Sequence, residues 1–406
     1  MKHRILFVDD EVNILRGIKR MLRGMKDEWD MAFAENGKKA LEMISKVPID
    51  VVVSDMRMPG MDGAQLLNEV RKLHPGTARI ILSGYSDKES ILRTVGPAHQ
   101  YLAKPCDGKL LIKTITSALE LRKLLKKDNL RSIVSGLEAL PTPLQVLSEL
   151  LEELNSPKAS ASSVAEILSQ DIAMTAQILK LTNSSFFAIP MGVTTAQHAV
   201  QLLGMETIRA LVLMVGFFTT FEGGEKENPL LDTLSLRSAS IGGLAMAITE
   251  EGKLEKAIAN QACCAGMVSH VGTLLLSAKW PEKFRQAMLL SDAEDIGIVE
   301  AEKRIIGTSH AEIGAYLLGL WGFTDPIVEA VAYHHTPSKS VWRKRGPLMA
   351  LHVAQHLTKS DGNIDDVNNN PGIGLDRQYL EELGVMDCLP VWQNIYHKFK
   401  ERKLAK

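Results

Sequence analysis

Five residues of the sequence carry the functional groups needed to accept a phosphoryl group. They are three carboxylates, a hydroxyl and an amine, each at the end of a short apolar run: Asp9, Asp10, Asp55, Ser83 and Lys104. Carboxylates held close together repel one another unless a hard cation such as Mg²⁺ lies among them. One of them can attack a phosphoryl group to form an acyl phosphate, while the metal and a lysine neutralise charge on the transferred oxygens. We expect Asp55 to be the nucleophile, with Lys104 and Ser83 contacting those oxygens.

The elements around these residues predict that all five meet at one edge of a sheet. β-Branched apolar runs alternate with helical patterns. Strands are expected at residues 4–10, 31–36, 50–55, 78–84 and 100–105, and helices at residues 13–25, 37–47, 64–74, 88–95 and 110–125. These β–α units predict an α/β fold with a doubly wound, five-stranded parallel sheet, whose ligands gather at the carboxyl ends of the strands. One acidic residue there could merely end a buried strand, but five reactive groups at one edge indicate a site.

Four segments of this region resemble the receiver domain of two-component response regulators: "FVDDE", "SDMRMPGMDG", "ILSGYSD" and "YLAKP". The resemblance covers residues 1–122, and no member of the motif set is missing. It implies phosphotransfer from a sensor histidine kinase to Asp55. It also implies a Mg²⁺ ion held by Asp10, Asp55 and the backbone carbonyl of Arg57, and Asp9 would assist this site. We therefore expect a receiver that can be phosphorylated.

The same resemblance implies a switch next to the phosphoryl group. Ser83 would shift to meet that group, and Tyr101 would be the aromatic residue that swings inward when it does. The bond between Lys104 and Pro105 would be cis, which a proline permits at a small energetic cost. Phosphorylation is therefore expected to re-shape the face formed by the fourth strand, its helix and the last receiver helix.

Residues 123–140 are expected to form a helical linker. An apolar stripe at helical spacing continues from the last receiver helix until Pro141 and Pro143 end it. The stripe lapses at the polar sequence "KKDN", residues 126–129. One continuous helix and two helices around this break both remain open.

Residues 141–358 have an almost entirely helical pattern, which predicts an all-α domain. Four segments resemble, in order and spacing, the HDOD domain, a relative of the HD phosphohydrolases: "DIAMTAQILKLTNSSFF", "TTAQHAVQLLGMETIRALVL", "SHAEIGAYLLGLWGF" and "VEAVAYHH". One departure from the family pattern is Ile172, which stands where a proline is usual. Residues 359–406 are expected to form a polar surface loop followed by short helices.

The resemblance also implies that the metal ligands of the hydrolytic relatives are lost. Active HD enzymes use a histidine, a His-Asp pair and a later aspartate to bind a metal that activates water. The residues at these places are Arg237, Ser269, His270 and Gln355. Cationic and neutral oxygen groups do not offset the charge of the metal. We expect a vestigial site and a domain that works by binding, not by hydrolysis.

A group of histidines keeps an enzymatic alternative open. His310, His334 and His335 match places where HD-GYP cyclic di-GMP phosphodiesterases carry extra metal ligands, and His352 and His356 lie four residues apart on one helix face. No carboxylate is placed among them by the sequence, and the Gly-Tyr-Pro signature of that family is missing. The alternative reading is a receiver-gated, metal-dependent phosphohydrolase.

Composition narrows the partners and the location. The 47 basic and 48 acidic residues give a formal charge of −1, so no global field favours nucleic acid or an acidic membrane. A basic recognition helix is not evident, which argues against direct nucleic-acid binding. The longest apolar runs fall short of a membrane span, and the four cysteines show no CxxC spacing. We expect a cytoplasmic protein without membrane insertion.

These observations predict a response regulator whose Mg²⁺-dependent receiver controls a non-catalytic HDOD output domain. The output domain would show or hide a surface for a downstream signalling protein. Phosphorylation of Asp55 would act by shifting a pre-existing equilibrium of domain packing or of homodimerisation.

Overall fold

The computed structural model describes residues 2–84, 97–125, 127–137, 140–142, 144–156, 158–183, 193–214, 219–220, 229–362 and 374–404. The expected helix at residues 88–95 lies outside these ranges.

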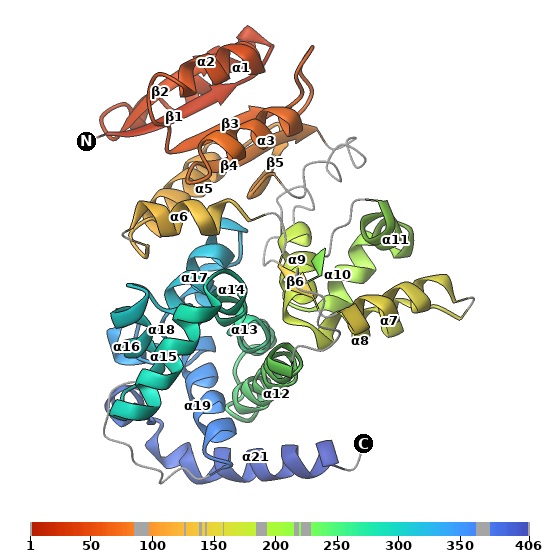
Figure 1. Cartoon of the computed structure of the whole chain (residues 1–406), viewed down its shortest axis with the longest axis vertical. Coiled ribbons are helices and arrows are strands. Elements are labelled where there is room, and N and C mark those ends of the chain that lie inside the picture. The colour runs from red at the N-terminus through yellow and green to blue at the C-terminus, as the bar shows by residue number, and fades with distance from the viewer. Residues whose placement is uncertain are drawn as a thin grey trace.

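The N-terminal half is built on a parallel sheet with the strand order β2-β1-β3-β4-β5. Its strands are β1 (His3–Val8), β2 (Trp29–Ala34), β3 (Val51–Asp55), β4 (Ala78–Gly84) and β5 (Gln100–Lys104). The central strands are buried on both faces, as expected of a parallel sheet covered by helices. The prediction of an α/β doubly wound sheet of five strands is confirmed (Figure 1).

Helices follow these strands. The described helices are α1 (Val12–Met21), α2 (Gly37–Ile44), α3 (Gly63–Leu73) and α5 (Gly108–Leu121). Three of them, α2, α3 and α5, begin at side-chain caps from Asn36, Asp62 and Asp107. The Asp62 side chain accepts from the Gln65 backbone while the Gln65 side chain accepts from the Asp62 backbone, a reciprocal cap for α3. A Cβ at Gly63 would lie 2.2 Å from the Asp55 carbonyl oxygen. Glycine therefore lets α3 start directly against the end of β3.

The connection between the two halves consists of two helices, not one. Helix α5 ends at Leu121, and α6 (Asp128–Ser135) begins within the polar sequence at residues 126–129. Both helices contact α17 of the C-terminal half, so the linker is packed between the domains (Figure 1). The interruption therefore starts before the polar sequence and includes Leu125, which is buried although it lies outside both helices.

In the described residues of the C-terminal part, the regular structure is helical apart from one short parallel pair, β6 (Pro141–Thr142) with β7 (Thr219–Thr220). Its helices are α7 (Leu144–Asn155), α8 (Ala161–Gln170), α9 (Ile172–Thr182), α10 (Ala196–Leu203), α11 (Met205–Met214), α12 (Pro229–Glu251), α13 (Lys256–Val268), α14 (Val271–Lys279), α15 (Pro281–Glu294), α16 (Ile298–Ile305), α17 (His310–Leu320), α18 (Asp325–Tyr333), α19 (Pro347–Lys359), α20 (Arg377–Glu382) and α21 (Leu389–Leu404). The predicted all-α class is confirmed.

The core of this half is formed by helices that are apolar on nearly every side. Helices α17 and α19 are buried along most of their length, and α14 crosses α17 closely. A Cβ at Gly272 in α14 would lie 1.9 Å from the backbone oxygen of His310, so only glycine fits that crossing. The stretch Lys256–Lys279 has the length and composition of a membrane span, and 72% of its most apolar window is buried inside the protein.

Candidate functional site

Three of the predicted phosphoacceptor-site residues, Asp9, Asp55 and Lys104, meet at the carboxyl edge of the sheet. The Lys104 amine at the end of β5 lies 2.7 Å from Asp9 Oδ2 and also contacts Asp55 Oδ1. The second oxygen of Asp55 accepts a hydrogen bond from the Arg57 backbone N–H at 2.8 Å, and Asp9 accepts one from Glu11 at 2.9 Å. Asp9, Asp55 and Lys104 are thus brought together as the sequence predicts.

The charge of Lys104 affects the pKa of the carboxylate beside it, and the carboxylates affect the pKa of Lys104. Burial raises the pKa of Asp55, while the hydrogen bond and the charge of Lys104 oppose that rise. Burial lowers the pKa of Lys104, but its contacts with Asp55 and Asp9 outweigh this, and the pKa is raised overall. Lys104 therefore stays charged beside the carboxylate that would carry the phosphoryl group.

The oxygen donors at this edge suit a hard divalent cation. Asp9 and Asp55 are buried, and Asp10, the next residue after Asp9, is exposed. Two buried carboxylates contact one lysine, so negative charge is in excess, and carboxylate and carbonyl oxygens are what Mg²⁺ prefers. Receiver domains generally bind Mg²⁺ for phosphorylation, where it neutralises charge on the phosphoryl oxygens.

The expected switch residues occupy the adjoining strands. Ser83 is buried near the end of β4, whose Leu82 pairs with Asp55. Tyr101 is buried in β5 and lines a cavity of about 700 Å³ between the two domains. The peptide bond from Lys104 to Pro105 is cis, as predicted.

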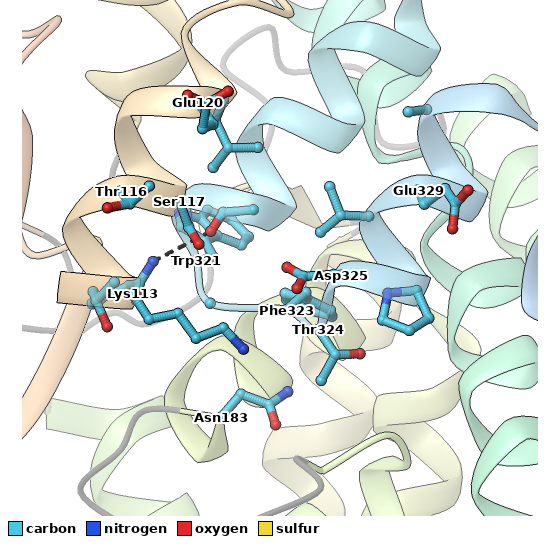
Figure 2. Close-up of a pocket in the computed structure, with 18 of the residues that line it drawn as sticks. Lys113, Thr116, Ser117, Glu120, Asn183, Trp321, Phe323, Thr324, Asp325 and Glu329 are labelled. Atoms are coloured by element: carbon cyan, nitrogen blue, oxygen red, sulfur yellow. Dashed lines mark hydrogen bonds between the residues drawn. The ribbon is translucent and has the colours of Figure 1, made fainter. Parts of the chain in front are cut away.

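The cavity beside Tyr101 is walled by both domains. Figure 2 shows side chains of α5 on one side and side chains from the start of α18 on the other. The Gln100 side chain donates a hydrogen bond to the Gly319 carbonyl of α17 at 3.3 Å. Gly319 also faces Leu121, whose Cδ2 would lie 2.5 Å from a Cβ at that position. Strand β5 thus connects the phosphoacceptor edge to the output domain.

Three of the four residues at the expected HD ligand positions line a second cavity, of about 590 Å³. Arg237, His270 and Gln355 line this cavity, and Ser269 lies beside His270. His270 Nδ1 is 2.9 Å from the Ser238 hydroxyl and 3.2 Å from the Ser269 hydroxyl. Burial, with the nearby charge of Arg237, lowers the pKa of His270 well below its usual range.

Three other histidines come together at the wall of the same cavity. His310 begins α17, and His334 and His335 directly follow α18. One ring nitrogen of each lies within 4.8 Å of the others, and the Nε2 atoms of His310 and His335 are 3.1 Å apart. His352 does not join them, because its Nδ1 donates to the His334 carbonyl and its Nε2 accepts from the backbone. His356 lines the cavity from α19.

Sequence reasoning missed one residue of this cluster, Glu302. Its fully buried carboxylate accepts from His310 Nδ1 at 2.8 Å and from the His310 backbone N–H at 2.8 Å. The segment "IVEAEKRI" reads as an amphipathic helix with exposed charges. Its burial could have been predicted from the helical spacing, because Glu302 falls on the same helix face as the apolar residues of α16.

Comparisons with known proteins agree with this architecture. A family model for the response regulator receiver domain matches residues 5–116, and a model for the HDOD domain matches residues 140–337. The hydrogenase transcriptional regulatory protein HoxA of Cupriavidus necator is 34% identical over 122 residues, which are 30% of this chain and 25% of that protein. The Escherichia coli transcriptional regulatory protein GlrR is 31% identical over 168 residues, 40% of this chain and 36% of that protein. The chain therefore spans well under half of these relatives.

Two solved structures are similar to parts of the chain. The signal receiver domain of an HD domain-containing protein from Pseudomonas fluorescens is 31% identical, covers 30% of this chain and 96% of its own, and has a TM-score of 0.28. The MmoQ response regulator of Methylococcus capsulatus is 21% identical, covers 62% of this chain and 94% of its own, and has a TM-score of 0.45. The two family models show that the chain contains an N-terminal response regulator receiver domain and a C-terminal HDOD domain, an architecture that supports a two-component response regulator.

Proposed function

We propose that Asp55 accepts a phosphoryl group from a sensor histidine kinase and that this event controls a binding surface on the HDOD domain. The observation that carries the proposal is the contact of Lys104 with both Asp55 and Asp9 at the carboxyl edge of the sheet. This arrangement provides a nucleophilic carboxylate and an amine that neutralises the charge developing on the transferred oxygens.

Strand β5 supports a direct route from this site to the output domain. Lys104 ends the strand at the phosphoacceptor, and Gln100 begins it with a hydrogen bond to Gly319 of α17. The four residue steps between them span about 13 Å of extended chain. Tyr101 lies between these ends and lines the cavity at the domain boundary. A shift of β5 on phosphorylation would therefore reach α17 without passing through a flexible segment.

The downstream partner is proposed to be a signalling protein bound by the HDOD surface. The sequence resemblance implies that Arg237, Ser269, His270 and Gln355 replace the metal-binding histidines and aspartates of the hydrolytic relatives, and the relatives HoxA and GlrR are named as transcriptional regulatory proteins. Binding needs no catalytic group from the output domain. A homodimer is a second state whose population phosphorylation could change.

Hydrogen exchange on the full chain tests this proposal. Acetyl phosphate with Mg²⁺ should phosphorylate the protein and change amide protection in α17 and α18. An Asp55→Asn variant should show neither effect, whereas Asp30→Asn, at a surface ion pair with Arg4, should behave as the unsubstituted protein. Phosphorylation that leaves α17 and α18 unchanged would contradict the proposed coupling, and phosphorylation of Asp55→Asn would contradict the assigned nucleophile.

A further inference from the structure

In the histidine cluster of the HDOD domain, one buried ring nitrogen, Nε2 of His334, has no hydrogen-bond partner among the described residues. His334 is 1% exposed, and its Nδ1 lies 2.8 Å from the Val331 carbonyl. A carbonyl only accepts, so Nδ1 carries the proton and Nε2 of the neutral ring is a bare lone pair. Within the described part of the chain, that Nε2 is buried and makes no hydrogen bond. An unsatisfied buried acceptor is costly and calls for a ligand.

The orientation of the His310 ring is fixed by Glu302, on the side of the ring away from the other histidines. The Glu302 carboxylate accepts from His310 Nδ1 at 2.8 Å, which turns Nε2 toward His335. Glu302 also accepts from the His310 backbone N–H, so the carboxylate and the start of α17 hold each other in place. A carboxylate behind a histidine is the usual arrangement that orients a metal-binding imidazole and raises its basicity.

The separations of the ring nitrogens approach those of a coordination sphere. With metal–nitrogen bonds of about 2.0–2.1 Å, two tetrahedral ligands lie about 3.4 Å apart. The Nε2 atoms of His310 and His335 are 3.1 Å apart, and the third imidazole offers a nitrogen within 4.8 Å. A hydrogen bond between His310 and His335 would explain only the contact between these two rings. It leaves the His334 lone pair unexplained, whereas one cation among the three nitrogens satisfies all of them.

We propose that His310, His334 and His335 bind one divalent transition-metal ion through their ring nitrogens, with Glu302 as the positioning residue behind His310. Three neutral imidazoles select the class of Zn²⁺, Co²⁺, Ni²⁺ or Fe²⁺ over Mg²⁺ and Ca²⁺. Arg237, Ser269, His270 and Gln355 contribute no ligand, so the site would consist only of the three histidines at the places where HD-GYP enzymes carry extra metal ligands.

The fourth coordination position would open into the adjoining cavity. Arg237 and Gln355 line that cavity, and within the described residues Arg237 Nε and Gln355 Oε1 are buried without a hydrogen-bond partner. A metal with an open position facing a guanidinium is suited to hold a water molecule or a small oxyanion. The inference goes beyond the function proposed above, since it does not depend on phosphorylation.

Metal titration of the full chain tests the site. The Asp55→Asn background weakens the receiver's own cation site, and chelator-treated protein is titrated with Co²⁺ as the probe. We expect one equivalent to bind with the visible absorption of a four- or five-coordinate nitrogen site. His335→Gln should lose this spectrum, and Glu302→Gln should weaken binding by about 10- to 100-fold. His198→Gln, at an exposed position outside the cavity, should bind as the background protein does.

Two results would overturn the proposal. The first is that the background protein binds no stoichiometric Co²⁺. Because this protein has no substitution in the cavity, misfolding of the cavity could not explain that result. The second is equal binding by the background and a folded His335→Gln protein, judged by circular dichroism, which would mean an adventitious ion only. Neither result bears on phosphorylation of Asp55, so failure here leaves the receiver proposal standing.

Discussion

Arg79 of the receiver donates a hydrogen bond from Nη2 to the Ser135 carbonyl at 2.5 Å and thereby joins strand β4 to the end of α6. The guanidinium is fully buried and also donates to the carbonyls of Pro97, Pro75 and Thr77. The Ser135 hydroxyl in turn lies 2.8 Å from the Tyr316 hydroxyl of α17. A buried cation at the carboxyl end of a helix is favourable, because the last carbonyls carry partial negative charge. The network ties the sheet, the linker and the output domain together.

Replacing Arg79 by lysine should weaken the domain junction. A lysine keeps the charge, but its three N–H donors sit on a single nitrogen. They cannot reach all the carbonyls that the planar guanidinium of Arg79 contacts in different directions. Buried carbonyls would lose their donors, which costs about 1–3 kcal/mol each. We expect a lower urea midpoint and faster proteolysis between α5 and α6. Arg4→Lys, at an exposed ion pair, is the control. Equal proteolysis of the two variants would show that Arg79 does not hold the junction.

The same junction should weaken in acid because it requires a neutral His99. His99 Nδ1 accepts from the Arg79 backbone N–H at 3.1 Å, and its Nε2 lies 2.8 Å from the Ser135 carbonyl, to which it donates. Burial, followed by the charges of Arg79 and Lys180, holds the pKa of His99 well below its usual range, although the Ser135 carbonyl acts in the opposite direction. Protonation of the unfolded chain near pH 6.5 therefore favours unfolding.

Because the pKa of His99 is lowered in the folded protein, its effect on stability appears only below the pKa of the unfolded chain. The contribution of His99 is fully present above about pH 6.5 and falls by about 1.4 kcal/mol for each pH unit below it. Urea unfolding at pH 7.5, 6.5 and 5.5 measures this slope. Other buried histidines add to it, so the informative quantity is the difference from His99→Asn, which keeps a donor and an acceptor without a titrating ring. Identical slopes for the two proteins would exclude His99 as the source.

The receiver could be predicted closely because its chemistry is local in the sequence. Asp9, Asp55 and Lys104 each end an apolar strand, and the parallel topology alone brings strand ends to one edge. Arg79 gave no such signal. An arginine inside an apolar strand reads as an edge residue with its charge in water, and its burial depends on α6, which comes from another part of the chain.

The output domain was predictable in class but not in its polar interior. Helical spacing gave the all-α fold, and the histidines were visible as candidates. The Glu302–His310 pair depends on how α16 packs against α17, which helix periodicity does not specify. The break between α5 and α6 remained open for a similar reason, since both alternatives place the same apolar residues on one stripe.

Gly272→Ala should destabilise the output domain selectively. The added Cβ would lie 1.9 Å from the His310 carbonyl oxygen and 2.9 Å from the Gly314 nitrogen, so α14 and α17 must separate. Overpacking of this kind costs about 1–3 kcal/mol or more. Gly17→Ala is the matched control, because nothing lies within 4 Å of its Cβ and alanine favours the middle of α1 by about 0.5–1 kcal/mol. A melting temperature for Gly272→Ala at or above that of the unsubstituted protein would contradict the close crossing.

Lys104→Met should slow phosphorylation of Asp55 without unfolding the receiver. The amine contacts Asp55 and Asp9, and its loss removes the positive charge that meets the transferred phosphoryl group. We expect the rate with acetyl phosphate, followed on phosphate-affinity gels, to fall at least about 10-fold. Lys109→Met, an exposed lysine in the first turn of α5, should keep the original rate. A rate for Lys104→Met equal to that of the control would remove Lys104 from the site.

The output domain is expected not to hydrolyse cyclic di-GMP, even if the histidine cluster holds a metal. Metal-dependent hydrolysis of the HD type uses a metal-bound water near a group that accepts its proton, together with anionic ligands that offset the charge of the metal. Arg237, His270 and Gln355 line the cavity in place of the HD ligands, and the Glu302 carboxylate is engaged by His310. Assays should use protein loaded with Co²⁺ or Mn²⁺, with and without acetyl phosphate, and the nucleotide products should be separated by chromatography.

Turnover that exceeds the metal-only blank and disappears in His335→Gln would establish the phosphohydrolase alternative and refute a binding-only output domain. Turnover that persists in His335→Gln would instead point to a contaminating enzyme, which a second purification of both proteins would remove.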